Sequence, residues 1–296
     1  MLKEAQRLTA GHNLFLLRQT AEIISCFNKN RLEVIILKGL SLAETVYPDI
    51  SRRRMADIDL LVKSKDISSA RSCLTELGYE LNPGNSALSY VKKGPVNACV
   101  DLHGGSLCLK EEDLWSSART FEIAGERAKT LAVEHNIIYL CWHLAAGHGY
   151  PYKRWLEDID RFITYHKDDI DWRSLAVKIK GLRLEIPCHL SLLKAKEVFK
   201  TRLPDEFMSL IRPKGSFKAA VFKSIFYSRS PIPWINYLSK ALFCPWRELL
   251  YTVFPQKAFL KMRYNITSKG VWFYYILRPF SLFSRGIKGI YRLILR

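Results

Sequence analysis

Residues 57–62 read DIDLLV, two aspartates separated by one isoleucine at the start of an apolar run. A short apolar run bounded by polar loops predicts a buried strand. In a strand, residues two apart point to the same face, so Asp57 and Asp59 project together, about 6–7 Å apart. Two like charges at the edge of a core repel each other and resist desolvation. A divalent cation with hard oxygen ligands, Mg²⁺ or Mn²⁺, resolves both problems; the alternative is a pair of acids in water or paired with arginine.

The chain before these acids carries groups that suit a phosphate. A strand predicted at 33–37 ends in Lys38 and Gly39, and a helix predicted at 41–47 has Ser41 as its candidate N-cap. A flexible glycine and the free N–H groups of a helix N-terminus let a phosphate approach the backbone. Three arginines then precede the acids: Arg52, Arg53 and Arg54.

A third in-strand acid, Asp101, lies in a strand predicted at 97–103. If this strand lies beside residues 57–62, three carboxylates converge, which is the set that two-metal phosphoryl transfer needs. His103 follows Asp101 by two residues and shares its face, where a contact with an acceptor and a structural role are both open.

Together the motifs LKGLSLAETVYPD at 37–49, RRMADIDLLV at 53–62 and VDLHGG at 100–105 resemble the DNA polymerase β-type nucleotidyltransferase superfamily. They are most similar to a group of bacterial nucleotidyltransferase-family proteins. The resemblance covers about residues 31–105 and extends more loosely through 141–159.

The resemblance implies roles for these residues. Asp57 and Asp59 would hold both metal ions, and Asp101 would hold the catalytic metal and help to activate an acceptor hydroxyl. Four residues would contact the nucleoside triphosphate: Lys38, Gly39, Ser41 and Arg53. The superfamily usually has Gly or Ser directly after the glycine, whereas Leu40 follows Gly39 here, so the role of Ser41 stays open.

The predicted fold class is α+β: a polymerase β-type nucleotidyltransferase core, which is a small mixed sheet with flanking helices, followed by helices. The predicted parts are an N-terminal helix, the core, a helical domain that shapes the acceptor cleft, and a basic, aromatic-rich helical C-terminal region. Their bounds are 1–30, 31–105, 106–210 and 211–296. Helical periodicity is expected from about residue 115 to residue 210.

Three residues of the helical region are candidates for the acceptor side. His143 and His148 are five residues apart, which on a helix separates them by about 140° and disfavours a metal pair. Asp158 lies four residues after Arg154, which predicts a helix-surface pair, unless Asp158 faces the active-site cleft.

The charge of the chain is uneven. The net charge is +18, yet residues 211–296 hold sixteen Lys and Arg and one acid, a balance of 16 − 1 = +15. That region is too apolar to be a disordered basic arm. It predicts helices with a basic face for an anionic membrane surface, nucleic acid or an acidic protein, or a solvated face that covers the core.

The seven cysteines are scattered without a C-x-x-C pair, which argues against a disulfide framework and for a reducing compartment. No stretch approaches the ~20 apolar residues of a membrane span. These features predict a cytoplasmic protein, with a peripheral position at the inner face of the membrane left open.

The leading hypothesis is a metal-dependent nucleotidyltransferase that moves a nucleotidyl group, with AMP from ATP favoured, to an acceptor hydroxyl. The acceptor is open among a small molecule, a protein, a glycan and RNA. The alternatives are a non-catalytic nucleotide-binding regulatory or antitoxin-like module and an RNA-binding protein led by the basic tail. The oligomeric state is open.

Overall fold

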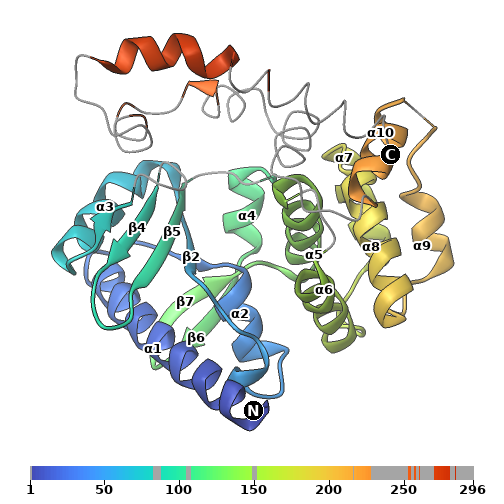
Figure 1. Ribbon diagram of the computed structural model, residues 1–296. Coiled ribbons are helices and arrows are strands. Elements are labelled where there is room, and N and C mark those ends of the chain that lie inside the picture. The colour runs from blue at the N-terminus through green and yellow to red at the C-terminus, as the bar shows by residue number, and fades with distance from the viewer. Residues whose placement is uncertain are drawn as a thin grey trace. The chain divides into compact units, whose positions relative to one another are not determined.

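The computed structural model of the chain describes residues 2–82, 88–104, 108–148, 152–215, 217–227, 253–254, 257, 260, 270–280 and 284. The chain divides into two compact units, Met1–Asn136 and Ile137–Arg296 (Figure 1). The division predicted from the sequence, at 1–30, 31–105, 106–210 and 211–296, stays a prediction.

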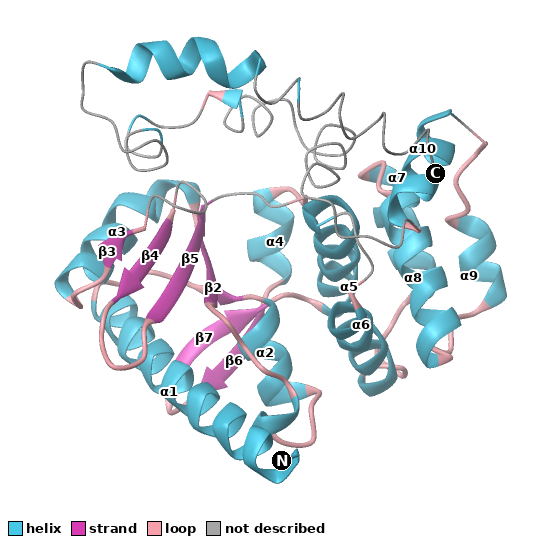
Figure 2. Ribbon diagram, in the orientation of Figure 1, coloured by secondary structure: helices cyan, strands magenta, loops and turns pink. Residues whose placement is uncertain are grey.

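The first unit is built on a seven-stranded mixed sheet with the strand order β3-β4-β5-β2-β1-β7-β6 (Figure 2). Its strands are β1 (Ile35–Ile36), β2 (Ile58–Val62), β3 (Glu80–Leu81), β4 (Ser89–Lys92), β5 (Ala98–Gly104), β6 (Arg119–Ile123) and β7 (Glu126–Thr130). The central strand β2 pairs antiparallel with β1 and parallel with β5. A mixed sheet with helices confirms the predicted α+β class.

Helices α1 and α3 pack on one face of this sheet (Figure 1). The helices of the unit are α1 (Leu2–Lys29), α2 (Lys38–Thr45), α3 (Ile67–Glu76) and α4 (Glu111–Ser117), with 3₁₀ turns at Ile50–Arg52 and Ser64–Asp66. Leu16, Ile23 and Phe27 of α1 are fully buried in one core with Ile58 and Leu60 of β2. Their spacing of seven and four residues lines one side of the helix, so α1 and the alternating pattern of β2 together define the core face.

Ser41 is not the N-cap that the sequence predicted. Helix α2 begins three residues earlier, at Lys38, and its N-cap is Leu37, which has an extended backbone and no side-chain cap. The Leu37 N–H donates to the Asp59 carbonyl at 3.0 Å instead. Because β1 bonds to β2 up to this point, the chain enters the helix directly from the sheet.

The helical expectation from residue 115 is wrong for residues 119–130, which form the hairpin β6–β7. Ala124 and Gly125 turn the chain with φ of 47° and 81°, as the two central residues of a tight hairpin require. Only glycine adopts such angles readily, so an Ala-Gly turn is a weak sequence signal. The hairpin extends the sheet because β7 pairs parallel with β1.

The second unit is helical. Helix α5 (Val133–Trp142) leads into it, and its further elements are a π-helix (His143–His148), α6 (Lys153–Tyr165), α7 (Trp172–Gly181), α8 (Glu185–Phe199), α9 (Asp205–Leu210) and α10 (Phe217–Phe226). Residues 271–280 form another helix. Most of the predicted tail at 211–296 lies outside the described residues. Across the described segments, no helix is both long and apolar enough to cross a membrane.

Candidate active site

Three carboxylates lie on one face of the sheet. Asp57 immediately precedes β2, Asp59 lies within β2, and Asp101 of β5 is the parallel partner of Asp59. Partners in adjacent strands point to the same face, and residues two apart in a strand do so as well. The predicted neighbourhood of the two strands is therefore confirmed, and the acids face away from the core residues Ile58 and Leu60.

Asp59 is a buried carboxylate held by Lys38 and by the ring of His103. Its side chain is 5% exposed; Lys38 Nζ lies 2.8 Å and His103 Nε2 lies 3.2 Å from its Oδ1. Burial by itself would raise the pKa of Asp59, but Lys38 and His103 outweigh it and hold this pKa well below its ordinary range. Asp59 therefore stays ionised, and its charge is offset inside the protein.

Asp57 has the opposite environment. Burial, and then the charge of Asp59, raise the pKa of Asp57 to about 6, and Asp101 adds to the effect. Lys38 and Arg53 act against it but do not compensate. The repulsion between acids that the sequence predicted is thus concentrated at Asp57, which would gain from an added positive charge.

Arg53 is the buried arginine of the run 52–54, and it packs on the start of α2. A Cβ at Gly39 would lie 2.8 Å from Arg53 Nη1, closer than real side chains approach. A side chain at position 39 would therefore displace this guanidinium from its place against α2. Arg52, in contrast, is exposed and pairs with Asp49 at 3.4 Å; a contact of Arg53 with the phosphates stays a prediction.

Asn13, which the sequence reasoning missed, fixes the loop that carries Arg53. Its Nδ2 donates to the carbonyls of Ile50 at 2.6 Å and Arg53 at 2.7 Å, and its Oδ1 accepts from Met55 N at 3.2 Å. Asn13 is fully buried, three residues before Leu16 on the core side of α1. A polar residue at a core position of an amphipathic helix was the available signal.

Ser89 of β4 was also missed, and it lies next to the third acid. Ser89 is the antiparallel partner of Asp101, and the flanking bond from Leu102 N to Leu88 O, at 3.0 Å, marks them as the closer type of cross-strand pair. The Ser89 hydroxyl is buried and has no hydrogen-bond partner within the described structure. No sequence pattern marks such a residue, because only the register brings it beside Asp101.

Ser41 is engaged at another strand. Its side chain is buried, and its Oγ lies 3.0 Å from Thr130 Oγ1 at the end of β7. The hydroxyl therefore contributes to joining α2 to the hairpin that extends the sheet. A contact of Ser41 with a nucleotide stays a prediction.

The acid face has the chemistry of a site for a hard divalent cation. Three carboxylates supply the oxygen ligands that Mg²⁺ and Mn²⁺ prefer. The Lys38 ammonium pairs with Asp59, which shows that these carboxylates favour a positive charge beside them. Among the described residues, however, no group of three Asp, Glu, His or Cys side chains is drawn together closely enough to hold a metal. The donor set fits, and its side chains would have to turn toward a bound ion.

The acceptor-side candidates of the second unit lie in and beside the π-helix. The His143 ring packs against Tyr139 and Trp155, with centroids 6.0 and 5.6 Å away. Asp158 is 1% exposed, so its side chain does not lie on the helix surface as expected, and a pair of Asp158 with Arg154 stays a prediction. The side chain of His148 lies outside the described residues.

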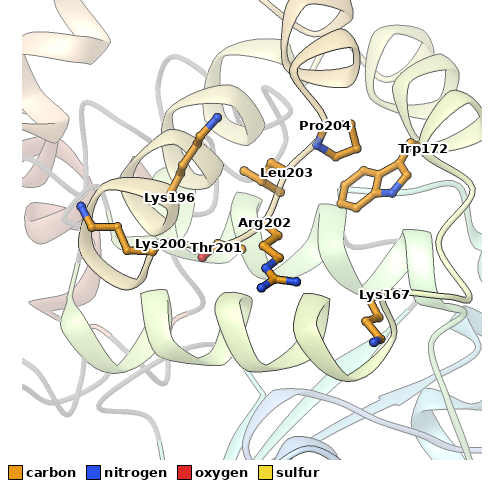
Figure 3. Close-up of a pocket in the computed structure, with 8 residues that line it drawn as sticks. All are labelled: Lys167, Trp172, Lys196, Lys200, Thr201, Arg202, Leu203 and Pro204. Atoms are coloured by element: carbon orange, nitrogen blue, oxygen red, sulfur yellow. The ribbon is translucent and has the colours of Figure 1, made fainter.

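A hollow of about 540 Å³ in the second unit has a basic lining (Figure 3). It is lined by Lys167, Trp172, Lys196, Lys200, Thr201, Arg202, Leu203 and Pro204. Among its cations, Lys196 pairs with Asp205 at 2.9 Å and Lys167 lies 3.9 Å from Asp168. None of the candidate site residues lines this hollow.

Comparison with known proteins identifies the family. Over residues 1–200 the chain matches the family described as "Uncharacterised nucleotidyltransferase". The match covers more than half of the 296 residues. The chain belongs to this nucleotidyltransferase family, which confirms the resemblance found in its motifs. No curated protein matches the chain.

Three solved structures are similar in outline. A solution structure of the antibiotic-resistance factor ANT(2″)-Ia aligns with a TM-score of 0.42 at 15% identity, over 62% of this chain and 98% of that one. A crystal structure of ANT(2″)-Ia in complex with adenylyl-2″-tobramycin aligns with a TM-score of 0.42 at 14% identity, over 56% of this chain and 96% of that one. A crystal structure of an antigenic nucleotidyltransferase-like protein from Paracoccidioides brasiliensis aligns with a TM-score of 0.36 at 15% identity, over 62% of this chain and 96% of that one. At these TM-scores the likeness assigns no substrate to this chain.

Proposed function

We propose that the chain transfers a nucleotidyl group, AMP from ATP, to an acceptor hydroxyl. The observation that carries the proposal is the parallel register of Asp59 and Asp101, with Asp57 two residues before Asp59. It places three carboxylates on one face of the sheet in a chain of a nucleotidyltransferase family. A buried acid cluster costs stability, so its presence calls for a function that needs concentrated negative charge.

Asp57, Asp59 and Asp101 would hold the divalent cations of this reaction, as they are the hard ligands of the acid face. Bound Mg²⁺ or Mn²⁺ would supply charge neutralisation for the triphosphate and the carboxylates. Arg53 and the start of α2 at Gly39 would bind the phosphates, because a buried guanidinium and free helix N–H groups both favour anions.

In the transfer, the acceptor hydroxyl oxygen forms a bond to the α-phosphorus while the bond from that phosphorus to its bridging oxygen breaks. Pyrophosphate leaves with the electron pair of the broken bond. The proton of the hydroxyl passes to the Asp101 carboxylate, which is half-buried, as is Asp57. Lys38, released from Asp59 once other positive charge arrives, can reach toward the phosphates from the first residue of α2.

The test is transfer of label from each of the four α-labelled nucleoside triphosphates in the presence of Mg²⁺ and a cell lysate. The Asp57→Asn/Asp101→Asn variant serves as the matched control because Asn keeps the side-chain shape. Label that appears on protein, RNA, lipid or a small molecule only with the native acids would establish the transferase and its acceptor class. Absence of labelled product with all four nucleotides would contradict the proposal.

One observation favours a second candidate, a nucleotide-binding module without transfer. The Lys38–Asp59 ion pair already neutralises the most buried of the three acids on this face, which is an arrangement a regulatory protein could keep permanently. Such a module would bind labelled ATP in the same preparation, would release it unchanged, and would bind it without dependence on Asp101.

A further inference from the structure

The helix at residues 271–280 exposes a continuous apolar face. Its five exposed large apolar side chains are 41–69% accessible: Trp272, Phe273, Ile276, Leu277 and Phe280. At about 100° per residue, these positions fall within an arc of roughly 140°. Val271 and Arg278 lie on the opposite side and are buried. The exposure therefore belongs to one side of this helix and does not reflect an unpacked segment.

Contiguous exposure of this kind is unusual among the described residues. The other large apolar side chains that are strongly exposed stand singly or in widely spaced pairs, such as Leu8 on α1 and Val177 on α7. Scattered exposure is ordinary for folded proteins, whereas a contiguous patch of aromatic and aliphatic groups marks a contact surface. The helix face thus calls for a partner.

The charge of the surrounding sequence indicates what that partner is. Residues 211–296 hold sixteen Lys and Arg and only Glu248 as an acid. Lys257 Nζ lies 5.8 Å from the centre of the Trp272 ring, which places a cation next to the apolar face. An apolar helical stripe within a strongly basic segment is the pattern of helices that lie in the interface of an anionic bilayer.

We propose that the face formed by Trp272, Phe273, Ile276, Leu277 and Phe280 docks on an anionic lipid surface. Ten residues are too few to cross a bilayer, which takes about 20, so the helix lies along the interface. The aromatic rings fit the headgroup level, the aliphatic groups enter the acyl boundary, and the surrounding cations attract anionic headgroups.

A nucleic acid fits this face less well. RNA needs cations or donors for its phosphates beside rings that stack on its bases. Lys257 beside Trp272 is one such cation, but Arg278 is on the buried side of the helix, and Ile276 and Leu277 offer nothing to a base or a phosphate. The test must therefore be able to detect binding of nucleic acid as well.

The test is flotation of the full-length protein with two kinds of vesicle. One is pure phosphatidylcholine, and in the other about a quarter of the lipid is anionic phosphatidylglycerol. Wild type is compared with Phe273→Glu/Ile276→Glu, and Val177→Glu on α7 is the matched control because Val177 is 71% exposed. A milder variant, Phe273→Ser/Ile276→Ser, removes apolar area without adding charge. Circular dichroism and thermal melts check that all proteins fold alike.

We expect wild type and the Val177→Glu control to float with the anionic vesicles. The Glu variant should bind at least about tenfold less, the Ser variant should lie between them, and neutral vesicles should bind weakly. Equal flotation of all proteins, or none for wild type, would overturn the proposal. Tight, salt-sensitive binding of RNA that is the same for wild type and the face variants, without flotation, would assign the basic segment to nucleic acid instead. The readout needs no nucleotide, so it is independent of the transferase activity.

Discussion

The two faces of strand β2 are built for different purposes. On one face Ile58 and Leu60 are fully buried against α1 and α3, and on the other Asp59 aligns with Asp101. Burial of apolar side chains on the core face stabilises the fold. The like charges on the acid face lower this stability. Substitutions on the acid face should therefore change activity more than stability, and those on the core face should do the reverse.

The largest expected effect is the loss of transfer when a carboxylate of the acid face is removed. Asp57→Asn and Asp101→Asn should each lower transfer by on the order of 10³-fold, or about 4 kcal/mol in the barrier, because each removes a charged ligand from the reacting centre. Neither should lower the free energy of unfolding. Label transfer and urea denaturation measure the two quantities, and near-native transfer by either variant would break the comparison.

Asp59 should be the exception on the acid face. Asp59→Ala leaves the Lys38 ammonium, whose side chain is 14% exposed, without its carboxylate, which typically costs about 3–4 kcal/mol for a buried pair. Lys38→Met together with Asp59→Ala should recover more than half of that loss. Urea denaturation of the single and double variants measures this recovery, and equal stability of the two would contradict a cost from the unpaired Lys38.

On the core face, Leu60→Ala should lower the free energy of unfolding by about 3 kcal/mol, because it leaves a cavity in a fully buried site. Transfer per folded molecule should stay close to native. Activity normalised to the folded fraction provides this measure, and a selective loss of transfer would mean that the two faces are not separable.

The pH dependence sharpens the difference between Asp57 and Asp59. The folded pKa of Asp57, about 6, lies above the unfolded value near 4, so ionisation in the folded state costs stability as pH rises through 4 to 6. Asp57→Asn should therefore be more stable than native protein by about 3 kcal/mol at pH 7, and this difference in stability should vanish below pH 4. Unfolding curves from pH 4 to 8 test the sign, and a gap that grows toward low pH would contradict it.

The smallest effect concerns two buried serines. Ser89→Ala removes a hydroxyl without a described partner and should raise stability by about 1 kcal/mol. Ser191→Ala removes a hydroxyl that donates to the Cys141 carbonyl at 3.1 Å and should lower stability by a similar amount. Thermal midpoints of both variants show whether they shift in opposite directions, as predicted, or together.

The sequence predicted the acid face because period-two alternation is a local pattern. Asp57, Asp59 and Asp101 could be placed on strands from their apolar neighbours alone. The positions that depend on long-range register could not be found in this way: Asn13 bonds a loop some forty residues away, and Ser89 meets Asp101 only through strand pairing. The hairpin β6–β7 was missed because its Ala-Gly turn is a weak sequence signal. The start of α2 was placed too late because its N-cap residue, Leu37, makes a backbone hydrogen bond to the sheet and has no side-chain cap.

The most direct measurement is electron paramagnetic resonance of Mn²⁺ titrated into the protein with a non-hydrolysable ATP analogue. The account predicts Mn²⁺ binding that requires the analogue for full occupancy, is lost in Asp57→Asn and Asp101→Asn, and is unchanged in the folded fraction of Leu60→Ala. Binding that is equal in the native protein and both acid variants would contradict the assignment of metal and nucleotide to the acid face.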